Sequence, residues 1–255
     1  MINAMKQFLN LDDLSNFEQT IIEGIKLKKN PNKFELLGNQ KTLGMLFFNP
    51  SLRTRLSTQK AAQNLGLKTM VMNFSNESWA LEFEDGNKMN GSKSEHIKEA
   101  AAVVSQYFDI VAIRAFASLT NKIKDEQEIV LSSFIKYASI PVVNMESATA
   151  HPLQALADAM TIKENYPINK PKIVLLDEPL AALDPLVIQD IQKYILKIQS
   201  SGTAILVTDH NVKNLFDITD RSYVLGEHTV IAEGTSRELL KSSKAIEHYF
   251  GTQFS

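Results

Sequence analysis

Two hydroxyls and an arginine stand close together near residue 50, where an apolar run gives way to a helical pattern. The stretch reads Phe47-Phe48-Asn49-Pro50-Ser51-Leu52-Arg53-Thr54-Arg55. The first turn of a helix has free backbone N–H groups and the positive end of the helix dipole, and both attract anions. The hydroxyls of Ser51 and Thr54 and the guanidinium of Arg53 add side-chain donors at this point. The sequence therefore predicts a phosphate-binding turn.

Three further polar residues are placed where they would face the same ligand. Arg114 follows the apolar run 110–113, and a helical pattern opens with His151-Pro152-Leu153-Gln154. Open parallel sheets bind ligands outside the carboxyl ends of their strands. We therefore expect Arg114, His151 and Gln154 to meet the Ser51 turn in one crevice. Taken singly, Ser51 is also explained as a helix cap and His151 as part of a turn.

A second group of residues with catalytic chemistry lies in the last third of the chain. The apolar run 173–176 ends in Asp177 and Glu178, and the run 204–208 is followed by Asp209 and His210. At a strand end, Asp177 would reach a magnesium-bound water and Glu178 would orient or deprotonate an attacking water. His210 would sense a γ-phosphate. Each also has a plainer explanation, as a capping turn for the acids and a solvated loop residue for the histidine.

Composition narrows the class of protein. The 255 residues leave room for one large domain or two small ones, and 44% hydrophobic with 22% charged residues is typical of a globular chain. A net charge of -2 without a long basic run excludes nucleic acid as a main partner. The absence of cysteine excludes disulfides, thiolate metal sites and cysteine nucleophiles, and fits a reducing compartment. Without a signal-peptide core or a long apolar segment, we predict a soluble, cytoplasmic protein.

Alternating strand and helix patterns must position these residues. Short apolar runs predict strands at 42–48, 69–74, 110–116 and 140–144. Helical spacing predicts helices at 12–27, 53–64, 95–107, 125–138 and 151–164. Strands separated by helices of this length indicate an α/β fold, a parallel sheet with helices on both faces.

A change of character near residue 170 predicts a domain boundary. Residues 165–172 contain two prolines and no periodicity, so we expect domains at 1–164 and 173–255 around this junction. After it, the pattern predicts strands 173–176 and 204–208, a helix at 186–199, a hairpin of 222–225 with 229–232, and two short terminal helices. Strand 173–176 follows helix 151–164 at right-handed crossover length, so it is also able to extend the first sheet.

The first part of the sequence resembles a known enzyme family. Ser51-Leu52-Arg53-Thr54-Arg55 and His151-Pro152-Leu153-Gln154 with Asp158 are similar to the two signatures of aspartate and ornithine transcarbamylases. More narrowly, residues 5–164 resemble the carbamoyl-phosphate domain of the N-acylornithine transcarbamylases of arginine biosynthesis, which act on N-acetyl- or N-succinyl-ornithine. The features that carry this narrower likeness are Phe47-Phe48-Asn49-Pro50, Trp79 with Leu81-Glu82, and Met145-Glu146.

The resemblance implies a role for each candidate residue. Those implied to bind carbamoyl phosphate are Ser51, Leu52, Arg53, Thr54, Trp79 and Arg114. Those implied to polarise the carbamoyl carbonyl as the acceptor amine attacks are Arg114, His151 and Gln154. Those implied to contact the acylornithine are Glu146, His151, Gln154 and Ser94, and serine at position 94 does not decide between acetyl and succinyl substrates. The family also implies a homotrimer in which Trp79 reaches a neighbouring subunit's site, and carbamoyl transfer requires no cofactor.

Residues 172–255 resemble a different family, the ATPase subunits of ABC transporters. The likeness rests on a Walker B strand ending in Asp177 with Glu178 as catalytic glutamate, a D-loop at Ala182-Leu183-Asp184, and the switch histidine His210. Asp209-His210-Asn211-Val212, Ala232-Glu233-Gly234-Thr235 and Tyr249-Phe250-Gly251 point to the lipopolysaccharide-export ATPase. This resemblance implies a partial Mg-ATP site of Asp177, Glu178, Asp184 and His210, with Asp177 as the magnesium ligand, and docking on the membrane subunits of a transporter.

Each resemblance lacks a part that its activity needs. No ornithine-binding domain of a transcarbamylase follows Lys172, and the Walker A pattern G-x-x-x-x-G-K-[ST] and the Leu-Ser-Gly-Gly signature do not occur in the sequence. Three hypotheses follow: a chain that binds carbamoyl phosphate without full turnover, a transporter ATPase fragment, or a composite with no turnover. We expect a fused α/β chain with a formed carbamoyl-phosphate site and an incomplete nucleotide site.

Overall fold

The chain divides into two compact units, Met1–Pro167 and Ile168–Ser255, each described by itself. This computed structural model describes residues 7–74, 80–84, 86, 93–165, 172–181 and 183–250. Most of the predicted junction, residues 166–171, lies outside the described residues. No helix within the described ranges is long and apolar enough to cross a membrane.

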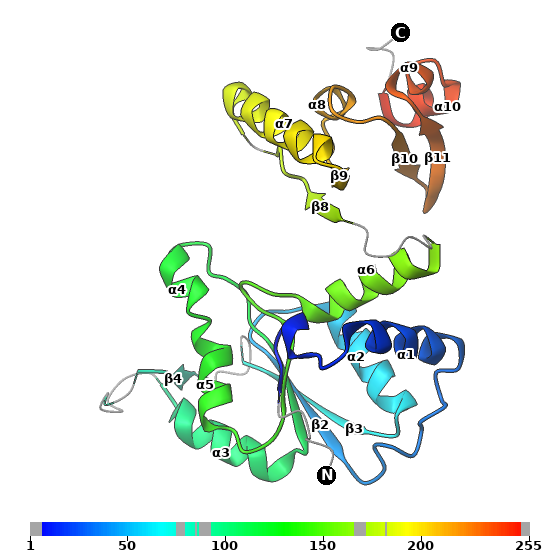
Figure 1. Cartoon of the computed structure of the whole chain (residues 1–255). Helices are drawn as coiled ribbons and strands as arrows, with labels where there is room; N and C mark the ends of the chain where they lie inside the picture. Colours follow the sequence, from blue (N-terminus) through cyan, green and yellow to red (C-terminus); the bar gives the residue numbers. More distant parts are fainter. Residues whose placement is uncertain are drawn as a thin grey trace. The chain divides into compact units, whose positions relative to one another are not determined.

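The first unit is built on a five-stranded parallel sheet with the strand order β1-β7-β6-β2-β3 (Figure 1). Its strands are β1 (Gln7–Phe8), β2 (Thr42–Phe47), β3 (Lys68–Asn73), β6 (Ile110–Arg114) and β7 (Val142–Glu146). The four predicted strands are present, but β6 already ends at Arg114 and β7 continues to Glu146. Strand β1 was not predicted, because two residues are too few to show a periodic pattern of apolar side chains.

The helices of the first unit are α1 (Phe17–Lys29), α2 (Leu52–Asn64), α3 (Ile97–Tyr107), α4 (Lys122–Glu126), α5 (Ile129–Tyr137) and α6 (Pro152–Asn165). Three predicted helices need correction. The helix expected at 95–107 begins only at Ile97, because Glu95 and His96 form a short strand and the His96 side chain caps the helix by accepting the Lys98 N–H at 3.1 Å. The helix expected at 12–27 begins only at Phe17, because the Asn16 side chain caps it by accepting the Gln19 N–H at 2.9 Å, and a separate turn, η1 (Leu11–Asp13), precedes it. The helix expected at 125–138 is broken at Glu128, whose φ of 45° is not helical.

Helices cover both faces of the sheet, as predicted (Figure 1). One face packs against α3 and α5 through buried residues that include Leu46, Val111 and Ile113. The opposite face packs against α2 and α6 through buried residues that include Met45, Phe47 and Ala112. Successive side chains of a strand point to opposite faces, so an unbroken apolar run supplies both cores. The two short strands β4 (Leu81–Glu82) and β5 (Glu95–His96) pair in parallel beside α3.

The second unit starts as a parallel βαβ unit and ends in an antiparallel hairpin. Its elements are β8 (Ile173–Asp177), α7 (Pro185–Ser200), β9 (Ala204–Thr208), α8 (Val212–Phe216), β10 (Ser222–Gly226), β11 (Thr229–Gly234), α9 (Ser236–Leu239), α10 (Ser243–Ala245) and a π-helical turn, Ile246–Phe250. The suggestion that strand 173–176 extends the first sheet is wrong. Among the described strands, β8 pairs with β9 along its whole length, because the α7 crossover returns the chain directly to its side.

Only one face of the β8–β9 pair is covered by α7. Ile188, Ile191 and Ile195 of α7 belong to the same apolar cluster as Leu176 and Ile205 of the strands. On the other face, the register partners Leu175 and Leu206 are 48% and 58% exposed. Parallel sheets are ordinarily buried on both faces, so this unit leaves apolar surface uncovered.

Candidate functional site

The predicted phosphate-binding turn forms the start of α2. Ser51 is the N-cap residue, and its Oγ accepts the Thr54 backbone N–H at 3.2 Å and donates to Thr54 Oγ1 at 3.0 Å. Leu52 and Arg53 are exposed, and Arg53 has no hydrogen-bond or ion-pair partner among the described residues. Because the first turn of a helix has N–H groups without intrahelical partners, this turn offers backbone donors and a free guanidinium to an anion.

Arg114 lies beside this turn and is almost fully buried, at 6% exposure. Its Nε donates to Glu146 Oε2 at 3.0 Å, and its Nη1 donates to the backbone oxygens of Asn49 and Pro50 at 2.9 and 2.8 Å. Within the described part of the chain, Nη2 has no hydrogen-bond partner. The guanidinium is therefore fixed against the residues that lead into Ser51 and keeps one end free for a ligand.

Asn49 and Phe116 complete the surroundings of Arg114, and neither has a role predicted from the sequence. The Arg114 guanidinium carbon lies 3.8 Å from the centroid of the Phe116 ring, a cation–π contact. The Phe116 backbone N–H donates to Asn49 Oδ1 at 2.7 Å, which ties the two loops together. The only hint of this contact in the sequence is an aromatic residue two positions after the arginine. That pattern is too common to predict a cation–π contact by itself.

Glu146 and His151 lie on the other side of Arg114. Glu146 Oε2 is 3.5 Å from His151 Nε2, while His151 Nδ1 accepts the Gln154 backbone N–H at 3.4 Å. The Gln154 side chain donates to Asp158 Oδ1 at 2.9 Å. The structure thus brings Arg114, Glu146 and His151 into one group, with Gln154 in the first turn of α6.

A buried asparagine holds the turn that leads to His151. Asn144, 1% exposed, donates from Nδ2 to Ser147 Oγ at 2.9 Å, and the Ser147 N–H donates to the Ala150 oxygen at 2.8 Å. This role could not be predicted from the sequence, because a single asparagine in an apolar strand has many uses. Two further candidates, Ser94 on the acylornithine side and Trp79 on the carbamoyl-phosphate side, are less informative. Ser94 is exposed and donates its backbone N–H to the Ala80 oxygen at 2.7 Å, and Trp79 lies outside the described residues.

The nucleotide candidates of the second unit gather where β8 and β9 end. The hydroxyl of Thr208 donates to Asp177 Oδ1, and the N–H of Glu178 donates to the Thr208 oxygen at 2.8 Å. Glu178 has a left-handed φ of 46°, a strained conformation for a glutamate. His210 Nδ1 lies 3.9 Å from Glu178 Oε2. Asp184 occupies the N-cap position of α7 without a capping hydrogen bond from its side chain, and Ala182 lies outside the described residues.

These residues do not form a magnesium site by themselves. Over the described ranges, no three histidine or carboxylate side chains are grouped so that they would hold a metal ion. Asp177 already accepts a hydrogen bond from Thr208, and Mg²⁺ requires an octahedral set of oxygen ligands. A single carboxylate leaves nearly all of that set to be supplied by a nucleotide and water.

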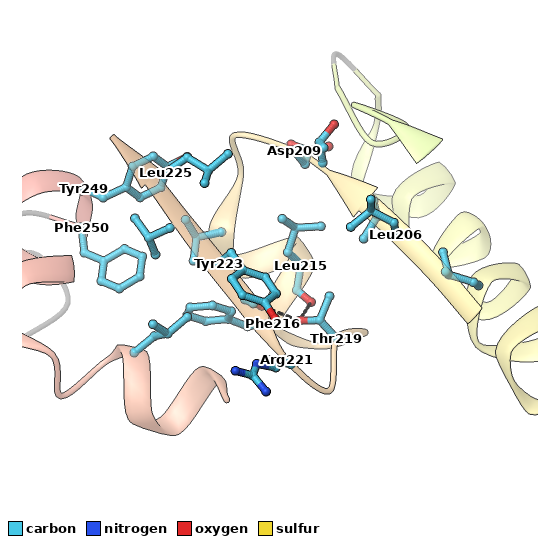
Figure 2. Close-up of a pocket in the computed structure, with 17 residues that line it drawn as sticks. Leu206, Asp209, Leu215, Phe216, Thr219, Arg221, Tyr223, Leu225, Tyr249 and Phe250 are labelled. Carbon is cyan, nitrogen blue, oxygen red and sulfur yellow. Dashed lines mark hydrogen bonds between the residues drawn. The ribbon is translucent and has the colours of Figure 1, made fainter. Parts of the chain in front are cut away.

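The second unit also has a cavity of about 300 Å³ between β9 and the β10–β11 hairpin (Figure 2). Its walls are mostly apolar and include Leu206, Leu215, Phe216, Tyr223 and Leu225, with Asp209 and Arg221 as the charged lining residues. Asp177, Glu178 and His210 do not line it. The cavity is therefore separate from the predicted nucleotide residues.

A helix start with free N–H donors, next to a buried arginine at the carboxyl edge of a parallel sheet, is the arrangement expected of an α/β phosphate-binding domain. Comparison with known families agrees with this class. The family described as "Aspartate/ornithine carbamoyltransferase, carbamoyl-P binding domain" matches residues 6–164. The chain belongs to the aspartate/ornithine carbamoyltransferase family and carries its carbamoyl-phosphate-binding domain.

Among relatives, the chain is 45% identical over 175 residues to the N-succinylornithine carbamoyltransferase of Bacteroides thetaiotaomicron, covering 69% of this chain and 55% of that enzyme. It is 39% identical over 165 residues to the N-acetylornithine carbamoyltransferase of Xanthomonas campestris pv. campestris, covering 64% and 48%. The match thus spans about half the length of these relatives. The first unit is thus similar to the corresponding part of N-acylornithine carbamoyltransferases.

Solved structures show the same relationship. A variant of N-acetyl-L-ornithine transcarbamylase complexed with carbamyl phosphate and N-succinyl-L-norvaline is 28% identical, with a TM-score of 0.64, covering 83% of this chain and 72% of that chain. N-acetylornithine transcarbamylase complexed with acetylcitrulline has a TM-score of 0.63 at 29% identity, covering 80% and 70%.

A shorter likeness concerns a transporter subunit. The lipopolysaccharide export system ATP-binding protein of Haemophilus influenzae is 39% identical over 84 residues, which is 33% of this chain and 35% of that protein. This is a similarity in sequence over a third of the chain. A two-stranded parallel βαβ unit is shared by many α/β folds, so the fold of the second unit does not identify an ABC ATPase.

Proposed function

We propose that the first unit binds carbamoyl phosphate at the start of α2. The observation that carries this proposal is the position of Arg114, which is tied to the Asn49 and Pro50 oxygens next to Ser51 and has a free Nη2. The phosphate would be held by the N–H groups of the first turn, the hydroxyls of Ser51 and Thr54, and the Arg53 guanidinium. A related transcarbamylase structure contains carbamyl phosphate, which supports the ligand.

The carbamoyl group would then lie toward Arg114 and His151. Donors directed at the carbonyl oxygen stabilise the negative charge that develops there when an amine attacks the carbon. Arg114 Nη2 and His151 Nε2 are the donors we assign to this task, with Gln154 beside them. Glu146 Oε1 has no hydrogen bond among the described residues, so it is available to the amine of an N-acylornithine.

We further propose that this chain does not complete carbamoyl transfer by itself. In this family the acceptor amine is bound by a second domain, and no part of the sequence after Lys172 resembles that domain. Proximity and exclusion of water together lower such barriers by roughly 7 kcal/mol or more, and both would be missing. We also propose that the first unit assembles into a trimer. In this trimer, Trp79 would contribute to the site of a neighbouring subunit.

A second candidate function concerns the second unit. The ends of β8 and β9 bring Glu178 within 3.9 Å of His210, an arrangement suited to a γ-phosphate and an attacking water. Without a glycine-rich phosphate loop in the sequence, we expect at most weak binding of Mg-ATP and no transporter-like hydrolysis. The function left to the second unit would then be docking on the membrane subunits of a transporter.

Parallel titrations test the two candidates. The purified chain is titrated by calorimetry with carbamoyl phosphate and with Mg-ATP, alongside Arg53→Ala and the control Lys60→Ala, which removes an exposed charge further along α2. We expect millimolar or tighter binding of carbamoyl phosphate that Arg53→Ala weakens and Lys60→Ala leaves unchanged. Absence of carbamoyl phosphate binding would overturn the first function. Carbamoylation of N-acetyl- or N-succinyl-ornithine by the chain would overturn the claim that turnover is missing.

A further inference from the structure

We propose that Glu146 is a positioning residue whose Oε2 atom orients Arg114 and selects the tautomer of His151 that carries its proton on Nε2. This inference deepens the proposed function and rests on it, because Arg114 and His151 are the groups assigned to the carbamoyl carbonyl. A single carboxylate oxygen lies within 3.0 Å of Arg114 Nε and 3.5 Å of His151 Nε2. No other described carboxylate makes an ion pair with either residue.

The contact with Arg114 fixes the direction of its guanidinium. A guanidinium has five N–H donors in a rigid plane. Nε donates to Glu146 and Nη1 donates to two backbone oxygens, which leaves Nη2 as the end that a ligand meets. Without Glu146, the two Nη1 hydrogen bonds alone would let the plane pivot about that nitrogen, so the direction of Nη2 would no longer be set.

The contact with His151 decides which ring nitrogen donates. A neutral imidazole has one N–H donor and one acceptor nitrogen. His151 Nδ1 faces the Gln154 backbone N–H at 3.4 Å, so Nδ1 is the acceptor and the proton belongs on Nε2. The negative oxygen of Glu146, 3.5 Å from Nε2, attracts the proton to that nitrogen without accepting a hydrogen bond from it, so the N–H stays available to a carbonyl oxygen. A protonated Nε2 is the form that donates a hydrogen bond to a carbonyl oxygen, whereas the other tautomer would direct a lone pair at it.

Simple electrostatics makes the opposite prediction for binding. A carboxylate close to an anion site repels the anion, so removing its charge should strengthen binding of carbamoyl phosphate if repulsion were its main effect. If positioning is its main effect, removing it should weaken binding despite the lost repulsion. The sign of the change in affinity therefore separates the two roles.

The experiment compares the full chain with Glu146→Gln, Glu146→Ala and the matched control Glu126→Gln. Glu126 is an exposed carboxylate of the same unit, paired only with Lys122 among the described residues. Each protein is titrated with carbamoyl phosphate, and the ¹⁵N signals of the His151 ring are recorded without ligand at about pH 8, where an ordinary imidazole is neutral. His151→Gln assigns those signals among the five histidines of the chain.

We expect the unmodified chain to show the Nε2–H form of His151. Glu146→Gln keeps the shape of the side chain but places either an amide N–H or an uncharged oxygen before Nε2, so the signals should shift toward the other tautomer or a mixture. Carbamoyl phosphate affinity should fall by about 10-fold or more, as metal affinity does when a residue that orients a metal ligand is removed. Glu126→Gln should change neither readout.

Two results would overturn the proposal. One is tighter binding by Glu146→Gln and Glu146→Ala, which would make Glu146 a repulsive neighbour only. The other is an unchanged His151 tautomer in Glu146→Gln. If Glu146→Ala fails to fold, as dispersion of its amide spectrum would reveal, the isosteric glutamine variant decides. If the unmodified chain does not bind carbamoyl phosphate at all, the proposed function fails, while the tautomer of the free protein still tests the role of Glu146.

Discussion

Arg114 and Glu146 are register partners across β6 and β7 only because the pairing of the two strands is irregular. Ile113 pairs with Asn144, the next residue Arg114 pairs with Glu146, and Met145 is passed over. Met145 is fully buried in the core between the sheet and α2 and α6. The irregularity thus keeps Met145 in the core and directs Glu146 toward the arginine, a use of strand bulges that is common beside active sites.

Replacing Arg114 should therefore affect both folding and binding. Arg114→Lys retains a positive charge, but an ammonium cannot reach Glu146, Asn49 and Pro50 in the fork geometry of a guanidinium. We expect the free energy of unfolding of the first unit to fall by about 2 kcal/mol, since hydrogen bonds that involve a charged group are lost. The backbone amide NMR signals of described residues of this unit, followed during urea unfolding, measure this change. Unchanged stability in Arg114→Lys would contradict the geometry described.

Ser51 serves both the helix and the ligand, and two substitutions separate these roles. Ser51→Ala removes the N-cap of α2 and should lower stability by about 1 kcal/mol, whereas Ser51→Gly costs only a few tenths because glycine is tolerated at this position. Both lack the hydroxyl, so both should weaken binding of carbamoyl phosphate to a similar extent. If Ser51→Gly binds as tightly as the unmodified chain, the hydroxyl does not contact the ligand.

The side chain of Glu128 binds the turn before His151, while its own backbone is strained. Its Oε1 accepts both the N–H and the hydroxyl of Thr149 at 2.9 Å, while its φ is 45°. Glu128→Ala and Glu128→Gly lose the same hydrogen bonds, but only glycine adopts this φ without strain. We expect the glycine variant to be more stable than the alanine variant by about 1 kcal/mol in urea unfolding. Equal stabilities would show that the strain is absent.

The second unit should lose a capping contact in acid. The Thr235 backbone N–H and hydroxyl donate to Glu238 and hold the pKa of this carboxyl below its ordinary value. Because the folded-state pKa is lowered, the stabilisation is complete above the unfolded pKa and disappears as the pH falls through the folded pKa. The stability difference between the chain and Glu238→Gln, followed on amide NMR signals of the second unit, should therefore shrink between about pH 6 and pH 3. A difference that stays constant over this range would contradict the cap.

The strands and the site turn are predictable from the sequence because both have local signatures. Apolar runs such as 110–113 mark a buried strand, and Ser51 follows directly from the cap preference of helices. The surroundings of Arg114 had no such signature. Its partners are the backbone oxygens of Asn49 and Pro50, which any residue type provides. The skipped Met145 likewise depends on how two strands pair, and the break at Glu128 is a strained conformation that tertiary contacts impose.

The pairing of β8 is not predictable from the sequence for a related reason. Residues 173–176 are apolar enough to join either sheet, and crossover length alone favoured the first. Pairing with β9 is the more local solution, since one helix connects the two strands and all five residues of each are in register.

The most direct test of the central claim is an amide NMR titration of the full chain with carbamoyl phosphate. We predict that the backbone amides of Leu52, Arg53 and Thr54, together with those around Arg114, shift with one common dissociation constant, and that inorganic phosphate competes for the same signals. Shifts that are absent, or that are centred on the second unit while residues 51–54 stay unchanged, would contradict the assignment of a carbamoyl-phosphate site to the start of α2.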